Sequence, residues 1–164
     1  MFNDYRVELS FKDFDQLKKK LDFCLKKKIY KINIPCKGNI KKDFLLEVVK
    51  FIGVKYKNFD VIYHYSFYHQ FQNNKNLSYL EFLNFLEVNK TYNKSNQILL
   101  VSGSRKRNQF EVLNILEKLK VDLSKNIKFG VAFNPYFLEE SDTKIERNRL
   151  IDKLNSYFVQ SIWL

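Results

Sequence analysis

Apolar residues along this chain occur in two patterns: short apolar-rich runs, and longer stretches where they recur every three or four positions. The first pattern is typical of strands, and the second of helices with one apolar face. The runs predict strands at 5–11, 29–34, 60–67, 98–102, 127–133 and from 161 onward. The periodic stretches predict helices at 12–28, 43–56, 79–89, 109–120 and 143–157. Trp163, in the last run, is expected to be a core residue, because aromatic side chains bury large apolar areas.

Strands and helices therefore alternate strictly along the chain. This order predicts an α/β protein in which parallel strands are joined by helical crossovers. Two architectures fit it, an open doubly wound sheet and a (β/α)8 TIM barrel. Because a complete barrel typically needs about 250 residues, this chain of 164 residues would supply about five and a half of the eight units. We expect a single, incomplete TIM-barrel domain over residues 1–164.

The start of the third helix is predicted from its capping residues. Ser78 can cap this helix, and Glu81 three residues later completes the pattern of a capping box. The polar residues at 70–76 are expected to form the loop that precedes it.

The net charge of +11 is a pronounced feature, and a basic balance can indicate nucleic acid or another polyanion as a partner. Only five of the 29 basic residues are arginine, however, and Lys, Asn, Ile, Phe and Tyr are all abundant. Codons for these residues are rich in A and T, so a biased genome would produce the same composition. We therefore expect no dedicated nucleic-acid surface. The alternative, an RNA- or DNA-associated basic protein, predicts an affinity that falls steeply with salt.

The sequence predicts a cytoplasmic protein without a metal. Cys24 and Cys36 are not spaced as a metal motif and are expected to be reduced thiols. His64 and His69 have no nearby cysteine or histidine partner for a zinc site. No signal-peptide pattern opens the sequence, and no run approaches the roughly 20 apolar residues that a membrane helix needs.

The turn after the fourth predicted strand carries a cluster of polar residues. The strand stops at Gly103, and Arg105, Lys106 and Arg107 follow almost directly. Ligands of parallel βα folds bind at this end of the strands, and concentrated arginine favours an anion such as a pyrophosphate or a polyglutamate tail. A tight turn and a solvated loop account equally for these residues. No dinucleotide-binding glycine pattern follows the first strand, and no Walker A loop is present.

The second half of the chain carries a pattern that can be compared with a known family. An apolar strand leads into Ser102-Gly103-Ser104, and the fifth strand contains Gly130-Val131-Ala132, followed by Pro135. A helix then ends at Lys153 before a last apolar strand. In these features residues 60–164 resemble the methylenetetrahydrofolate reductase family. Those proteins are flavin-dependent TIM barrels that reduce a folate-bound methylene group to a methyl group.

The resemblance implies an oxidoreductase of one-carbon metabolism, with FAD as cofactor, NAD(P)H as hydride donor and a folate as small-molecule substrate. Glu8 falls where the family keeps its catalytic glutamate, which would protonate the folate nitrogen. The residues that the resemblance places near FAD are His64, Ser102, Gly103, Ser104, Arg105 and Lys153.

Ser104 is the main departure from the family pattern, because the family has Arg-Gly-Asp where this chain has Ser102-Gly103-Ser104. The alternative hypothesis is therefore a catalytically degenerate barrel that binds a folate, a nucleotide or a partner protein without redox chemistry. A barrel of fewer than eight units would be a fragment, a truncated copy, or a half that needs a partner, as in a homo-oligomer.

Overall fold

The structure, a computed structural model, describes residues 5–36, 42–95, 97–102, 112–122, 127–136, 138–156 and 158–164. The strands are β1 (Val7–Glu8), β2 (Lys31–Ile34), β3 (Asp60–Ser66), β4 (Gln97–Val101), β5 (Lys128–Ala132) and β6 (Val159–Trp163). The helices are α1 (Phe14–Lys26), α2 (Lys42–Lys55), α3 (Lys75–Tyr92), α4 (Val112–Asp122) and α5 (Glu140–Leu154). The predicted α/β class and the strict alternation of its elements are confirmed.

The six described strands form one parallel sheet in the order β1-β2-β3-β4-β5-β6. The expected parallel pairing is therefore confirmed. A doubly wound sheet reverses its strand order at a switch point, and the order of the described strands contains no such reversal. In this singly wound order, right-handed crossovers place successive helices on the same face of the sheet.

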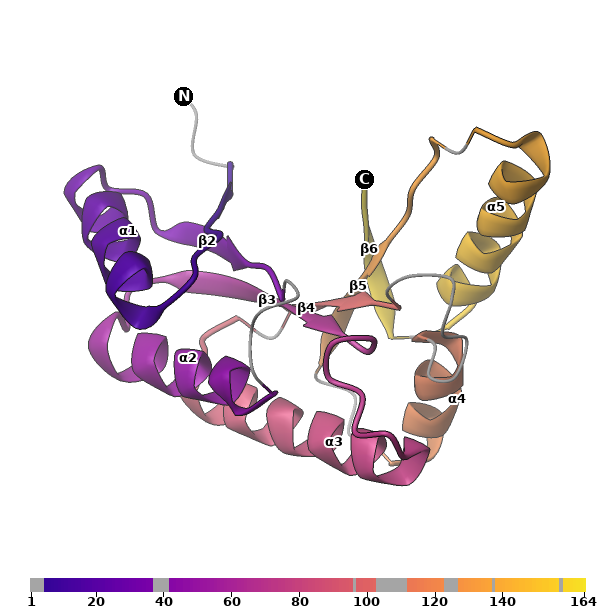
Figure 1. The fold of residues 1–164 in the computed structure, drawn as a ribbon, viewed down its shortest axis with the longest axis horizontal. Helices are drawn as coiled ribbons and strands as arrows, with labels where there is room; N and C mark the ends of the chain where they lie inside the picture. Colours follow the sequence, from indigo (N-terminus) through magenta and orange to yellow (C-terminus); the bar gives the residue numbers. More distant parts are fainter. Residues whose placement is uncertain are drawn as a thin grey trace.

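One face of the sheet packs against the helices and forms the hydrophobic core. Ile32, Val61, Tyr63, Ile98 and Phe129 of the strands belong to this core, together with buried apolar side chains of α1 to α4. Figure 1 shows the helices following one another in an arc around the outside of the strands. In α1 to α4, the apolar faces predicted from the sequence are thus the surfaces that cover the sheet, whereas Ile145, Ile151 and Leu154 of α5 are exposed.

The opposite face carries none of the described helices, and we call it the helix-free face. Side chains alternate between the two faces along a strand, and residues paired across strands share a face. Register and alternation assign to this face Glu8, Asn33, Ile62, His64, Leu99, Gly130, Ser161 and Trp163. Ile62 and Leu99 are buried here, so the helix-free face has an apolar floor.

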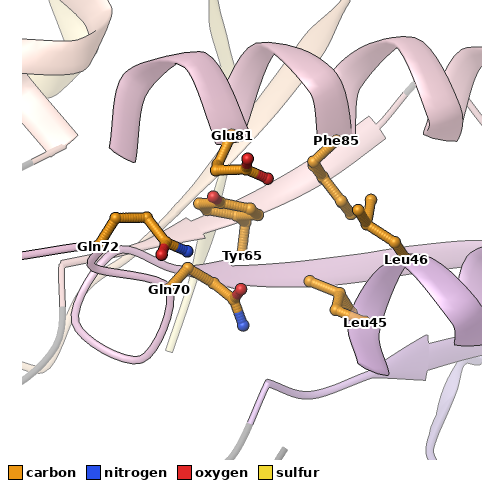
Figure 2. Close-up of a pocket in the computed structure, with 7 residues that line it drawn as sticks. All are labelled: Leu45, Leu46, Tyr65, Gln70, Gln72, Glu81 and Phe85. Atoms are coloured by element: carbon orange, nitrogen blue, oxygen red, sulfur yellow. The ribbon is translucent and has the colours of Figure 1, made fainter. Parts of the chain in front are cut away.

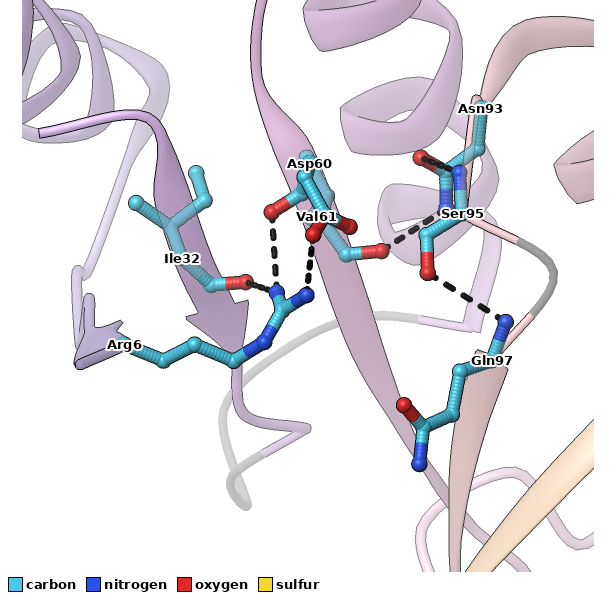
Figure 3. Close-up of polar contacts among 7 residues, drawn as sticks. All are labelled: Arg6, Ile32, Asp60, Val61, Asn93, Ser95 and Gln97. Carbon is cyan, nitrogen blue, oxygen red and sulfur yellow. Dashed lines mark hydrogen bonds and ion pairs between the residues drawn. The ribbon is translucent and has the colours of Figure 1, made fainter. Parts of the chain in front are cut away.

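A basic side chain fixes the amino ends of the first three strands (Figure 3). Arg6 forms an ion pair with the carboxylate of Asp60. Its guanidinium also donates to the backbone carbonyl oxygens of Ile32 at 3.3 Å and Asp60 at 3.0 Å. The side chain therefore reaches from β1 past β2 to β3, and it supports the pairing of the short first strand.

The start of α3 differs from the prediction. The cap is Asn74, whose side-chain oxygen accepts hydrogen bonds from the amides of Asn76 at 2.9 Å and Leu77 at 3.1 Å. Ser78 is buried inside the first turn, where its hydroxyl donates to the Asn74 carbonyl oxygen and accepts from the amide of Gln72. The prediction that Ser78 caps the helix is wrong, because an asparagine one turn earlier offers the same chemistry.

Replacing Asn74 by alanine is expected to lower the free energy of unfolding by about 1 kcal/mol, because two amides at the start of α3 lose their acceptor. Asn84→Ala is the matched control, since Asn84 is exposed in the interior of the same helix. This control should be neutral or slightly stabilising, as alanine is the better helix former. Urea denaturation measures both changes, and equal losses would contradict the assignment of Asn74 as the cap.

The described residues form no membrane-spanning helix and no cluster of metal ligands, and their two cysteines are free thiols. None of the helices in the described part of the chain is long and apolar enough to cross a bilayer. The same residues contain no group of three or more His, Cys, Asp or Glu side chains that could hold a metal ion. Cys24 and Cys36 are both buried as free thiols.

Candidate functional site

A polar network lies on the helix-free face at β4 and β6. The side-chain amide of Gln97 donates to the hydroxyl oxygen of Ser161 at 2.6 Å. The indole Nε1 of Trp163 donates to the same oxygen at 3.2 Å. All three side chains are only partly buried, so the network borders solvent. The hydrogen bond that the indole donates to Ser161 fixes the orientation of its ring.

Gly130 provides the space that this indole occupies. A Cβ atom at Gly130 would lie 2.7 Å from Nε1 of Trp163 and 2.8 Å from the hydroxyl oxygen of Ser161, closer than van der Waals contact allows. His64 approaches the same indole edge-on, with ring centroids 5.9 Å apart and an interplanar angle of 71°. The two aromatic rings, from β3 and β6, therefore form an aromatic corner on the helix-free face. The prediction that Trp163 is a core residue is wrong, since its side chain lies on the face opposite the core.

Asn33 places a buried hydrogen-bond acceptor on this face. The residue is 6% exposed, and its Oδ1 atom accepts no hydrogen bond within the described part of the chain. Leaving such an atom buried and unsatisfied costs about 1–3 kcal/mol. Asn33 pairs directly with the exposed Glu8 of β1, so an amide and a carboxylate lie side by side. A ligand that carries N–H groups would offset the cost at Asn33.

Ser102 follows β4 at the carboxyl edge of the sheet. Its hydroxyl oxygen accepts a hydrogen bond of 3.4 Å from the amide of Val112, at the start of α4. The serine thus acts in part as a cap for that helix. Gly103, Ser104 and Arg105, predicted to bind the cofactor, lie outside the described residues.

Lys153 is the only charged residue in the buried set of the described chain, with 5% of its surface exposed. Its amine lies 3.7 Å from the carboxylate of Glu146 and donates to the carbonyl oxygen of Ala132 at 3.4 Å. These contacts place the ammonium group between α5 and the end of β5. Pairing with Glu146 compensates for the burial of the charge. Lys153 is therefore engaged within the domain and does not join Glu8 and His64 on the helix-free face.

Cys36 lies at the carboxyl edge of β2, where its thiol accepts a hydrogen bond of 3.3 Å from the side-chain amide of Gln70. Burial raises the pKa of this thiol, and hydrogen bonds from Gln70 and the backbone of Ser66 lower it by less. The net pKa is above that of an ordinary cysteine, so the thiol stays protonated at neutral pH. Cys36 is therefore not an activated nucleophile.

A pocket near this edge is too small for an organic ligand. It has a volume of about 10 Å³, which is about the space that one water molecule needs. Its lining residues are Leu45, Leu46, Tyr65, Gln70, Gln72, Glu81 and Phe85 (Figure 2). Burial raises the pKa of the Tyr65 phenol, with smaller contributions from Cys36 and Glu81, so the phenol is neutral at physiological pH.

The structure brings Glu8 and His64 to one face, as a shared site requires. It adds four residues that the sequence reading did not assign to a site: Asn33, Gln97, Ser161 and Trp163. One local signal points to Asn33, which is a single polar residue between two isoleucines of a predicted buried strand. The others are brought together only by the pairing of distant strands.

Neither a protein-family model nor a curated protein matches the sequence. Function is therefore inferred from the residues of the helix-free face.

Proposed function

We propose that the helix-free face binds a planar heteroaromatic ring, and that this ring is the flavin of FAD in a reductase similar to methylenetetrahydrofolate reductase. The observation that carries the proposal is the position of Glu8, Asn33, His64 and Trp163 on one face of a sheet that the helices leave open. The face offers a carboxylate, a buried acceptor and two aromatic rings. The acceptor and the two aromatic rings are groups that suit a flat ring with N–H donors, and the carboxylate can hold a proton beside it.

The strand order supports a barrel as the architecture for this function. Strands that pair in chain order, with helices around their outside, follow the arrangement of a (β/α)8 barrel. We propose that the six described strands form part of such a barrel, with the helix-free face lining its interior. The ligand would then enter from the carboxyl edge, where Ser102 lies.

The residues of the face fit the proposed cofactor in two ways. The buried oxygen of Asn33 would accept a hydrogen bond from a ring N–H group, and the rings of His64 and Trp163 would border the flavin. FAD, when bound, would supply hydride transfer from NAD(P)H to the folate methylene. Glu8 is exposed on this face and would hold the proton that the folate nitrogen receives.

One observation favours a second candidate, ring binding without reduction. Two residues that the family resemblance places near FAD are engaged inside the domain, Ser102 with the amide of Val112 and Lys153 with Glu146. A site that does not use these groups would retain the contacts for the ring but lack contacts for the rest of FAD. This second candidate would bind a folate, through its pterin, in the same aromatic corner.

Titration of the intrinsic fluorescence tests the proposal, because Trp163 is the only tryptophan in the chain. FAD or tetrahydrofolate bound beside its indole is expected to quench the emission in a saturable manner. Asn33→Leu should weaken this binding about tenfold or more, since a ligand N–H group would lose its acceptor. The same variant should unfold at a higher temperature without ligand, because a buried unsatisfied oxygen is removed.

Glu8→Gln separates the two candidates. It should leave FAD binding unchanged and lower NAD(P)H-dependent turnover of methylenetetrahydrofolate by about 100-fold or more. Glu87→Gln, an exposed carboxylate on α3, is the matched control and should change neither quantity. Ring binding without turnover in the unmodified protein would select the second candidate. A fluorescence that neither FAD nor tetrahydrofolate changes would exclude both.

A further inference from the structure

A second cavity lies on the helix side of the sheet, at the amino end of β3. It has a volume of about 400 Å³, which is within the range of small-molecule sites. It is bounded by the end of α2, the turn into β3, and the end of α3 with the residues that follow. The lining residues are Ile52, Gly53, Val54, Tyr56, Lys57, Phe59, Val61, Tyr63, Thr91, Tyr92, Asn93 and Lys94.

Specific contacts fix the walls of this cavity. At one wall, α2 and α3 approach so closely at Gly53 that an added Cβ would lie 2.6 Å from the Cβ of Tyr92. At another, the side-chain amide of Asn93 donates to the carbonyl oxygen of Val61 at 2.9 Å, as Figure 3 shows. The Tyr56 hydroxyl donates to the carboxylate of Asp22 at 2.8 Å and secures the turn into β3. The cavity is therefore held open by the fold and needs no ligand to form.

The accessible apolar surface of the cavity comes from Val54 and Tyr92, which are 52% and 38% exposed. Beneath them, Ile52, Phe59, Val61 and Tyr63 are buried and form the packed base of the cavity. The exposed surface of Val54 and Tyr92 favours an apolar body, because contact with it removes apolar area from water on both sides.

The rim of the cavity is basic. Lys57 and Lys94 line it and are exposed, and Lys55 and Lys90 lie in the last turns of α2 and α3. None of the described residues that line the cavity is acidic. The carboxyl ends of two helices add only about half a negative charge each, so the lysines dominate the potential at the rim.

We propose that this cavity binds an amphipathic anion, with an aromatic or aliphatic body against Val54 and Tyr92 and a carboxylate or sulfonate group at Lys57 and Lys94. The site lies on the helix side of the sheet, and the aromatic corner of His64 and Trp163 lies on the other face. Binding in this cavity therefore does not depend on the proposed function. Charge complementarity and the exposed apolar lining together select this ligand class over a free inorganic anion, which would leave Val54 and Tyr92 uncovered.

The probe for the test is 8-anilinonaphthalene-1-sulfonate, an aromatic sulfonate whose fluorescence rises in an apolar environment. Titration of the folded protein at low salt is expected to show saturable binding at one site, and decanoate should displace the probe. Lys57→Glu combined with Lys94→Glu should raise the dissociation constant about tenfold, since two attractive charges become repulsive. Lys50→Glu combined with Lys75→Glu makes the same change of net charge, at exposed lysines of α2 and α3 that lie outside the lining and the rim, and should change the dissociation constant less than twofold.

Thr91→Phe provides an independent variant, because it places a large side chain at an exposed position of the cavity wall and leaves the core unchanged. It should abolish probe binding while the thermal unfolding temperature stays within a few degrees of the parent protein. Probe binding that persists in Thr91→Phe would overturn the location. If Thr91→Phe abolishes probe binding but the two double lysine variants weaken it equally, the proposal that the ligand is an anion would be overturned. The absence of saturable binding in the parent protein would overturn the proposal as a whole.

Discussion

Replacing Phe82 by alanine is expected to lower the free energy of unfolding by about 3–5 kcal/mol, the range for a large aromatic side chain removed from a packed core. Phe82 is fully buried in α3, at the centre of the aromatic part of the core. Its ring centroid lies 4.8 Å from that of Tyr65, 5.2 Å from that of Phe67 and 6.2 Å from that of Phe129. The substitution would leave a cavity between α3 and strands β3 and β5.

A loss of this size is a large share of the roughly 5–15 kcal/mol by which a domain is stable. Phe23→Ala in α1 is the matched control, because the ring of Phe23 is 57% exposed. Urea denaturation of both variants gives the difference, and the control should lose less than about 1 kcal/mol. Equal losses at the two positions would show that Phe82 is not the central ring of this core.

Gly53→Ala is expected to destabilise the protein by about 1–3 kcal/mol, although the same change inside a helix normally stabilises by about 0.5–1 kcal/mol. The sign reverses because α2 and α3 meet at this position. An added Cβ would lie 2.6 Å from the Cβ of Tyr92 and closer still to the Tyr92 carbonyl oxygen. A backbone oxygen is present whatever residue occupies position 92, so no side-chain substitution there relieves the overlap.

Gly130→Ala is the matched comparison, because it tests whether the loss at Gly53 comes from overlap with a backbone atom. The atoms nearest to an added Cβ at Gly130 belong to the side chains of Trp163 and Ser161, which can rotate. This variant should lose less stability than Gly53→Ala and should shift the emission of Trp163. Thermal and urea unfolding with tryptophan fluorescence as the probe measure both effects. A stabilised Gly53→Ala variant would contradict the close contact between α2 and α3.

The candidate site was predictable only in part. The family resemblance selected Glu8 and His64 from the order of the elements, and the register places them on one face. It could not select the pair Gln97 and Ser161, which are 64 positions apart and meet only because β4 and β6 both pair with β5. Trp163 was expected in the core because its size suggests burial, but the alternation along β6 places it on the opposite face.

The sequence by itself determined which segments become strands and helices, their alternation and the parallel direction of the sheet. These properties depend on the periodicity of apolar residues within each segment and on the right-handed crossovers between consecutive strands. Residues that are close together in the chain determine both. The tertiary structure alone decided the strand register, the face on which each polar side chain lies, and the cavity between the ends of α2 and α3. Those depend on contacts between residues that are distant in the chain, such as Gly53 with Tyr92 and Arg6 with Asp60. Such contacts form only when the whole sheet and its helices are packed, because no single segment holds both partners.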